Sequence, residues 1–173
     1  MYRRIFLLGG TAMVAGANTE QKASVSKVDN RIICRVAVNS TEIALDSNLE
    51  ITCFLECLKG PVQIYVPFSW GYRGFEVELI GPDKTQYVPP INNFHLPPLE
   101  MIKSPENNIS MYEGMVMGEK RQFAARDLFP HRGVYTLLTG YVSPVPAEYA
   151  LSKSVLVYED GVIPSKPIQI KVT

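Results

Sequence analysis

The chain has 173 residues, of which 46% are hydrophobic and 20% charged, and this combination suits one globular domain with a real core. Its 17 Lys and Arg residues balance 17 Asp and Glu residues, so the sequence lacks the basic stripe that a nucleic-acid partner requires. Thirteen Pro and twelve Gly residues favour many short strands and turns over long helices. The composition therefore excludes a disordered or fibrous chain and gives no support for nucleic-acid binding.

Residues 1–17 have the three parts of a secretory signal peptide. A basic start is followed by an apolar run, Ile5–Val14, and by Ala15-Gly16-Ala17, an A-x-A cleavage site with Ala17 as the predicted last residue of the signal. The run is shorter than the roughly 20 residues that span a membrane, so we expect cleavage and no stable membrane anchor. Arg3-Arg4-Ile5-Phe6-Leu7 resembles the core of a bacterial twin-arginine signal, with the general secretory route as the alternative. We expect a periplasmic or secreted protein.

Residues 18–30 are polar and aperiodic, which predicts a flexible lead, and residues 31–173 form the predicted domain. Alternating apolar and polar residues within it predict strands. These are Arg31–Val38, Leu49–Leu58, Val62–Val66, Phe75–Ile80, Gln86–Val88, Gly118–Ala125, Gly133–Tyr141, Val155–Tyr158 and Ile168–Val172. The Pro- and Asn-rich stretch Pro89–Gly114 predicts an irregular crossing segment between two sheets.

The strand Gly133–Tyr141 carries a further signal. Tyr135 lies near its start, two residues after Gly133, as in a tyrosine corner, where the phenol bonds to upstream backbone. Short strands at roughly even spacing, with turn residues between them, favour an all-β chain. We therefore predict an immunoglobulin-like antiparallel β-sandwich with Greek-key connections.

The same segments resemble the exported immunoglobulin-like domains of bacteria. The resembling parts are Gly60-Pro61-Val62, Leu79-Ile80-Gly81-Pro82-Asp83, Gly118-Glu119, Asp127-Leu128, Gly133-Val134-Tyr135 and the closing Ser165–Val172. The pattern is similar to the non-catalytic sandwich that precedes some secreted zinc peptidases, and more distantly to small sandwich proteinase inhibitors of bacilli. The resemblance implies the fold much more than any activity.

Three cysteines allow at most one internal disulfide. Cys53 and Cys57 lie on one strand, about 13 Å apart at ~3.3 Å per residue, which is too far for a bond. A hairpin that turns near Leu45-Asp46 would place Cys34 opposite Cys57, so a Cys34–Cys57 disulfide is the first expectation. A Cys34–Cys53 disulfide and three reduced buried thiols are the alternatives.

The sequence gives no support for catalysis. Its two histidines, His95 and His131, are far apart and allow no H-E-x-x-H site, and no G-x-S-x-G elbow or phosphate-cradling glycine loop is present. Glu76 and Glu78 alternate on one strand face and are interpreted as solvated. We expect no enzyme, no metal and no cofactor. A hydrolase of unrecognised type is the alternative, and it would need a cleft that gathers a histidine with acids.

One aromatic cluster could bind a ligand. Phe68, Trp70 and Tyr72 recur at period two beside Arg73, so they could form a platform for a sugar ring or a partner side chain, with Arg73 as the polar anchor. In the alternative interpretation, Trp70 closes the end of the core. The sequence thus predicts a binding or accessory module for a protein or carbohydrate, and a proteinase inhibitor that presents the loop Pro89–Met115 is the alternative.

Overall fold

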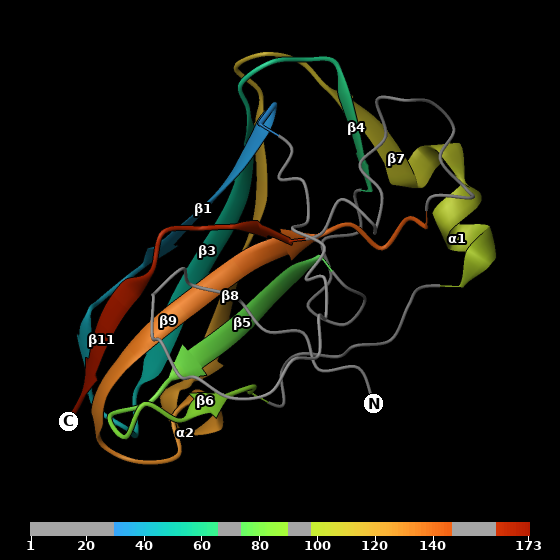
Figure 1. The fold of residues 1–173 in the computed structure, drawn as a ribbon. Helices are drawn as coiled ribbons and strands as arrows, with labels where there is room; N and C mark the ends of the chain where they lie inside the picture. The colour runs from blue at the N-terminus through green and yellow to red at the C-terminus, as the bar shows by residue number, and fades with distance from the viewer. Residues whose placement is uncertain (1–29, 66–73, 90–97, 147–161) are drawn as a thin grey trace, which may run out of the picture.

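The computed structural model describes residues 30–65, 74–89, 98–146 and 162–173. In these residues two sheets pack face to face as an immunoglobulin-like β-sandwich (Figure 1). The predicted fold class is therefore confirmed. Strand pairs are antiparallel except for the pairing of β2 (Glu42–Ile43) with β11 (Ile168–Val172), which is parallel.

The first sheet has the order β1-β3-β8, and the second has the order β2-β11-β9-β5-β6, with β10 paired to β9. Their remaining bounds are β1 (Ile32–Val38), β3 (Asn48–Cys57), β8 (Val116–Ala124), β5 (Phe75–Ile80), β6 (Gln86–Tyr87), β9 (Gly133–Val142) and β10 (Val162–Pro164). The predicted strands within the described ranges are confirmed. The short strands β2 and β10 were not predicted, because two or three residues are too few to show a period of two.

The core lies between the two sheets, where the alternating side chains of both meet. It includes Leu49, Ile51 and Leu55 from β3, and Val77 and Leu79 from β5, all with no exposed surface. Burial of such side chains contributes about 1.5–3 kcal/mol each. The period-two pattern of the sequence therefore orients both sheets correctly.

The predicted tyrosine corner is present at the start of β9. The hydroxyl of Tyr135 donates a hydrogen bond to the carbonyl oxygen of His131 at 2.8 Å, and its buried ring packs on Phe129, with ring centroids 4.9 Å apart. The exposed His131 lies over the same ring at 5.8 Å. The corner fixes the chain where it enters the central strand of the second sheet.

The segment Pro89–Gly114 crosses between the sheets, as predicted, but the part from residue 98 onward is not irregular. It contains α1 (Leu99–Lys103), a 3-10 turn (Pro105–Asn107) and β7 (Asn108–Met111). The side chains of Asn107 and Asn108 donate to the carbonyls of Met101 and Ile102, each at 2.9 Å. These bonds satisfy backbone groups that the short helix leaves open, which the Asn-rich sequence alone did not reveal.

A second short helix, α2 (Ala125–Leu128), follows β8. In the ranges that the structure describes, no helix has the length and apolar character needed to cross a membrane. The predicted signal peptide, the lead to residue 29 and the strand expected at Val155–Tyr158 lie outside the described residues.

Candidate functional site

The predicted aromatic platform of Phe68, Trp70, Tyr72 and Arg73 lies outside the described residues, as does Ala17. The platform therefore stays a prediction. The functional surfaces that the structure does describe come from other parts of the chain.

The expected pairing of Cys34 with Cys57 is wrong. The two strands do form an antiparallel pair, but Cys34 lies opposite Leu55, and Cys57 lies opposite Ile32. The expected register differs by two residues, because the connection between the strands is centred between Ala44 and Leu45 instead of Leu45 and Asp46. Cys34, Cys53 and Cys57 are all buried and free.

Cys34 and Cys53 are unsuited to nucleophilic chemistry. Burial raises the pKa of Cys34 far above its usual value, and the nearby Cys53 raises it further. Burial also raises the pKa of Cys53 to about 12, against a smaller lowering by a hydrogen bond with Thr139. Because the thiolate is the reactive form, both thiols behave as apolar core groups. Among the described residues, no cluster of His, Cys, Asp or Glu could hold a metal ion.

The interpretation of Glu78 as a solvated acid is also wrong. Glu78 is only 5% exposed, and its Oε2 accepts a hydrogen bond from Gln86 Nε2 at 2.8 Å, across the β5–β6 pair. The pKa of Glu78 is raised, and burial is the largest cause. The hydrogen bond from Gln86 opposes this shift, and the charge of Glu76 adds to it. Glu78 is a buried acid in the second sheet, and the amide of Gln86 donates a hydrogen bond to its carboxylate.

The most distinctive surface lies where two long strands bend together. β3 pairs with β8, and β4 (Val62–Tyr65), which follows β3, pairs with β7, which precedes β8. The four strands therefore form one antiparallel ribbon that bends at residues 58–61 and 112–115 (Figure 1). Between the pairs Glu56↔Val116 and Val62↔Met111, residues 57–61 lie opposite residues 112–115, so the first strand has one extra residue, as at a β-bulge. Bulges let strands turn from one sheet toward another. We call this bend the corner.

The corner is held by backbone hydrogen bonds. Cys57 N–H donates to Met115 O, and Gly114 N–H donates to Cys57 O, both at 2.9 Å. The amides of Leu58 and Lys59 both donate to Arg31 O, at 2.7 and 3.1 Å. The residue that precedes β1 thus supports the corner.

Two glycines permit this geometry. A Cβ on Gly60 would lie 2.8 Å from Met111 O and 2.9 Å from the Cα of Tyr112, so only glycine allows the two chains to approach this closely. Gly114 has a φ of +81°, which side chains other than glycine adopt at a cost. The bend is therefore encoded in the sequence by Gly60 and Gly114.

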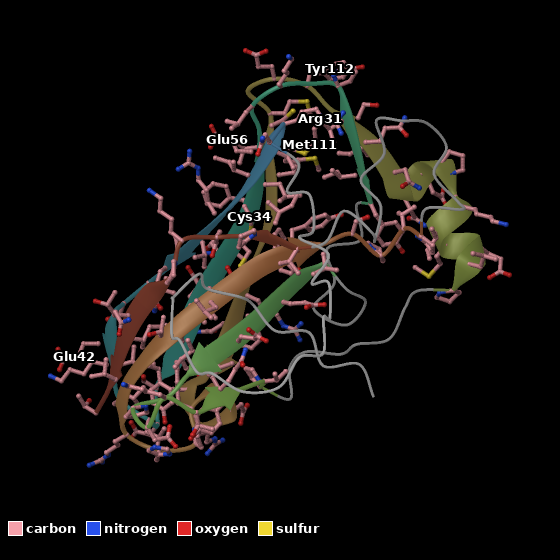
Figure 2. The ribbon with its side chains drawn as sticks, in the orientation of Figure 1. Arg31, Cys34, Glu42, Glu56, Met111 and Tyr112 are labelled. Carbon is pink, nitrogen blue, oxygen red and sulfur yellow. The ribbon has the colours of Figure 1, made fainter. Side chains whose placement is uncertain are left out.

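The corner exposes a group of apolar side chains. Tyr112 is 60% exposed, Val116 54%, Leu58 44% and Met115 38%, and these are four of the seven large apolar side chains that are exposed in the described residues. Figure 2 shows Tyr112 at this end of the molecule, with Arg31, Glu56 and Met111 nearby. The backbone N–H of Tyr112 donates to Met115 Sδ at 3.2 Å, which fixes the Met115 side chain against the backbone of Tyr112. This surface was not predicted, because residues 112–114 belong to the segment expected to be irregular, and nothing in the sequence pairs that segment with residues 58–61.

A charged recess lies at the other end of the sandwich, near α2. It is open, has a volume of about 320 Å³ and is lined by Ala44, Leu45, Asp46, Arg126, Arg132 and Thr173. It contrasts with the corner, where apolar side chains dominate. The two ends of the sandwich thus differ in chemistry.

No protein-family model matches the sequence, and no curated protein matches it. Among solved structures, the CARDB domain of the PF1109 protein from Pyrococcus furiosus, in complex with di-metal ions, is 7% identical with a TM-score of 0.37. That match covers 82% of this chain and 91% of the domain. A β-glucosidase from Listeria innocua in complex with glucose is 9% identical with a TM-score of 0.39, over 82% of this chain and only 16% of the enzyme. AvmM, which catalyses macrocyclization in alchivemycin A biosynthesis, is 9% identical with a TM-score of 0.37, over 84% and 90%. Matches at these identities and scores carry no inference about function.

Proposed function

We propose that the chain is an exported, non-catalytic binding module that engages a protein partner through the corner. Export is supported by the signal-peptide pattern of residues 1–17. The absence of catalysis is supported by the protonated thiols of Cys34 and Cys53 and by the position of His131, which lies against Tyr135 in the tyrosine corner.

The exposure of Leu58, Tyr112, Met115 and Val116 on a hydrogen-bonded frame carries the proposal. Tyr and Met are enriched at the centres of protein interfaces, and a rigid frame reduces the entropy lost on binding. Lys59 and Glu113 are exposed beside them, as expected of a polar rim. A sugar ring would need flat aromatic faces with polar anchors, whereas the corner offers one aromatic ring among aliphatic side chains. This chemistry favours a protein partner over a carbohydrate.

Site-specific photo-crosslinking in the cell envelope of the source organism tests the proposal. A photoreactive side chain at Tyr112 should give a defined protein adduct, and the same side chain at Val134 should not. Val134 is a matched control, because it is 52% exposed on β9 and lies away from the corner. Equal labelling from both positions would contradict the proposal.

Binding of the identified partner can then be measured with purified proteins. Tyr112→Ser and Leu58→Ser should each weaken binding, by about 2 kcal/mol if the residue is an interface hot spot. The thermal midpoint should hold, because both side chains are exposed. If the partner is a protease that the chain inhibits without being cut between residues 112 and 116, the inhibitor alternative replaces the accessory module. Unchanged binding by the double variant would exclude the corner.

A further inference from the structure

β8 has one open edge. It is the last strand of the first sheet, and all nine of its residues pair with β3 on one side. Over the described part of the chain, no strand pairs with its other side. Cys57 N–H donates to Met115 O in the β3–β8 pair, so alternate residues from Met115 onward direct their backbone groups to β3. The residues between them direct their N–H and C=O groups to the open edge, and these are Val116, Gly118, Lys120 and Gln122.

The hydrogen bonds of β3 agree with this assignment. Asn39 N–H donates to Glu50 O at 3.2 Å, so the backbone of Glu50 is directed to the β1 side. Gln122 is the register partner of Glu50 on β8, and its backbone is therefore directed away from β3. An incoming strand would find, at every second residue of this edge, donors and acceptors that no described strand uses.

The side chains of β8 are complementary to a second copy of the same strand. A two-fold axis at Lys120 would pair the strand with itself in antiparallel orientation. Met117 would lie opposite Phe123 of the second copy, and Glu119 opposite its Arg121. Both are non-hydrogen-bonded positions, where opposing side chains approach most closely. Each contact occurs twice, as a two-fold interface requires.

Charge selects this register over its neighbours. An axis at Glu119 or at Arg121 would place like charges directly opposite each other, which is unfavourable. At the chosen axis the two Lys120 side chains face each other, but each already pairs with its own Glu50, with Nζ 3.2 Å from Oε2. The repulsion between the two Lys120 side chains is thus reduced by the Glu50 carboxylate of each copy.

In the single chain, Glu119 and Arg121 each have polar atoms that could still make a hydrogen bond or an ion pair. Oε2 of Glu119 is buried and accepts no hydrogen bond in the described part of the chain. The guanidinium of Arg121 lies over the ring of Phe123, 5.4 Å from its centroid. Arg121 makes no ion pair with an acid in the described part of the chain. A guanidinium from a second copy would supply donors beside the buried carboxylate.

We propose that two copies of the chain associate through β8, with Lys120 on the two-fold axis. The first sheets then form one continuous sheet in the order β1-β3-β8-β8-β3-β1. The charges at Glu119 and Arg121 disfavour pairing with strands of other sequence, so the edge selects its own complement. This self-association is independent of the partner proposed for the corner.

Sedimentation velocity of the full chain over a concentration series tests the dimer. The wild type should show a reversible monomer–dimer equilibrium. Arg121→Glu places two acids opposite each other at two positions and should weaken association at least about tenfold. The charge swap Glu119→Arg with Arg121→Glu restores opposite charges and should recover dimerisation. Arg132→Glu, which makes the same charge change in the loop before β9, should have no effect.

A proline tests the backbone pairing separately. Gln122→Pro removes an N–H that is directed to the open edge and spares the β3 ladder. It should therefore abolish the dimer while the circular dichroism spectrum of the monomer is retained. A wild type that stays monomeric at every concentration overturns the proposal, and so does a dimer that survives both Arg121→Glu and Gln122→Pro. A charge-swap variant that is folded but monomeric would overturn the register.

Discussion

The hydroxyl of Tyr135 lies 2.8 Å from the carbonyl oxygen of His131, and this bond ties the start of β9 to the loop that precedes it. Because the ring of Tyr135 is buried against Phe129, packing already fixes the position of its hydroxyl, and the hydrogen bond costs no additional side-chain entropy. The bond therefore couples the central strand of the second sheet to α2 and its following loop.

Replacing Tyr135 with Phe removes this hydrogen bond and keeps the ring. We expect Tyr135→Phe to lower the free energy of unfolding by about 1 kcal/mol, measured by urea denaturation. Tyr87→Phe is the matched control, because its hydroxyl makes only long contacts to Asp83, at 3.3 and 3.4 Å. The control should change stability by no more than about 0.5 kcal/mol. Equal losses in the two variants would show that the hydrogen bond from Tyr135 to His131 contributes no more to stability than the contacts of the Tyr87 hydroxyl.

Glu78 gives the fold a pH dependence. Because burial raises its pKa above the usual 4.5, the folded chain holds this proton more tightly than the unfolded chain. The free energy of unfolding should therefore fall as the pH rises from about 4.5 through the raised pKa, and then stay reduced. Glu78→Gln removes the charge and leaves an oxygen that can accept the bond from Gln86.

The Glu78→Gln variant should be more stable than the wild type at about pH 7 and equal to it below about pH 4, where Glu78 is protonated in both states. Urea denaturation at several pH values measures the difference. Glu113→Gln, at an exposed position of the corner, is the control and should change stability little at any pH. A Glu78→Gln variant that is less stable at neutral pH would show that the ionised carboxylate contributes favourable contacts.

Thiol titration decides between free cysteines and a disulfide. With Cys34, Cys53 and Cys57 buried and free, a small aromatic disulfide reagent should label none of them in the native chain at mildly alkaline pH. It should label all three in concentrated urea, because burial is lost. The protein should be taken from the exported fraction without a reducing agent. Labelling of a single thiol in urea would instead establish an internal disulfide.

The corner depends on close approach at Gly60. Gly60→Ala should lower the free energy of unfolding by about 1–3 kcal/mol, because the added methyl meets backbone atoms of Met111 and Tyr112. Gly114→Ala tests a different cost. Among the described residues, apart from its two chain neighbours, no atom lies within 4 Å of the added Cβ. The positive φ is therefore the cost that we expect, at about 1 kcal/mol.

Asn tolerates positive φ better than Ala, so Gly114→Asn should recover part of the loss, whereas Gly60→Asn should recover none. Thermal and urea unfolding of these four variants measure the effects. If both positions respond to Asn in the same way, backbone conformation alone would account for the two glycines.

The sequence by itself predicted the class of fold and the faces of its strands. Alternation along Asn48–Cys57 survives in the structure because a strand has two faces and only one of them reaches the core here. In β9 the alternation is kept only near the start, because both faces are buried from Leu137 to Val142. The tyrosine corner was also readable, since Tyr135 and its acceptor His131 are only four residues apart. Local patterns of this kind need no knowledge of distant partners.

Only the tertiary structure decided which residues meet across the chain. Cys34 faces Leu55 instead of Cys57 because a small shift in the turn centre moves the whole register, and a sequence does not fix that centre. Glu78 became a buried acid through packing around β5 that its alternating pattern does not report. The corner formed because β3–β4 and β7–β8, more than 40 residues apart, bend as one ribbon. Pairing over such separations depends on the sum of many contacts, and for that reason the apolar surface at the bend was not predicted.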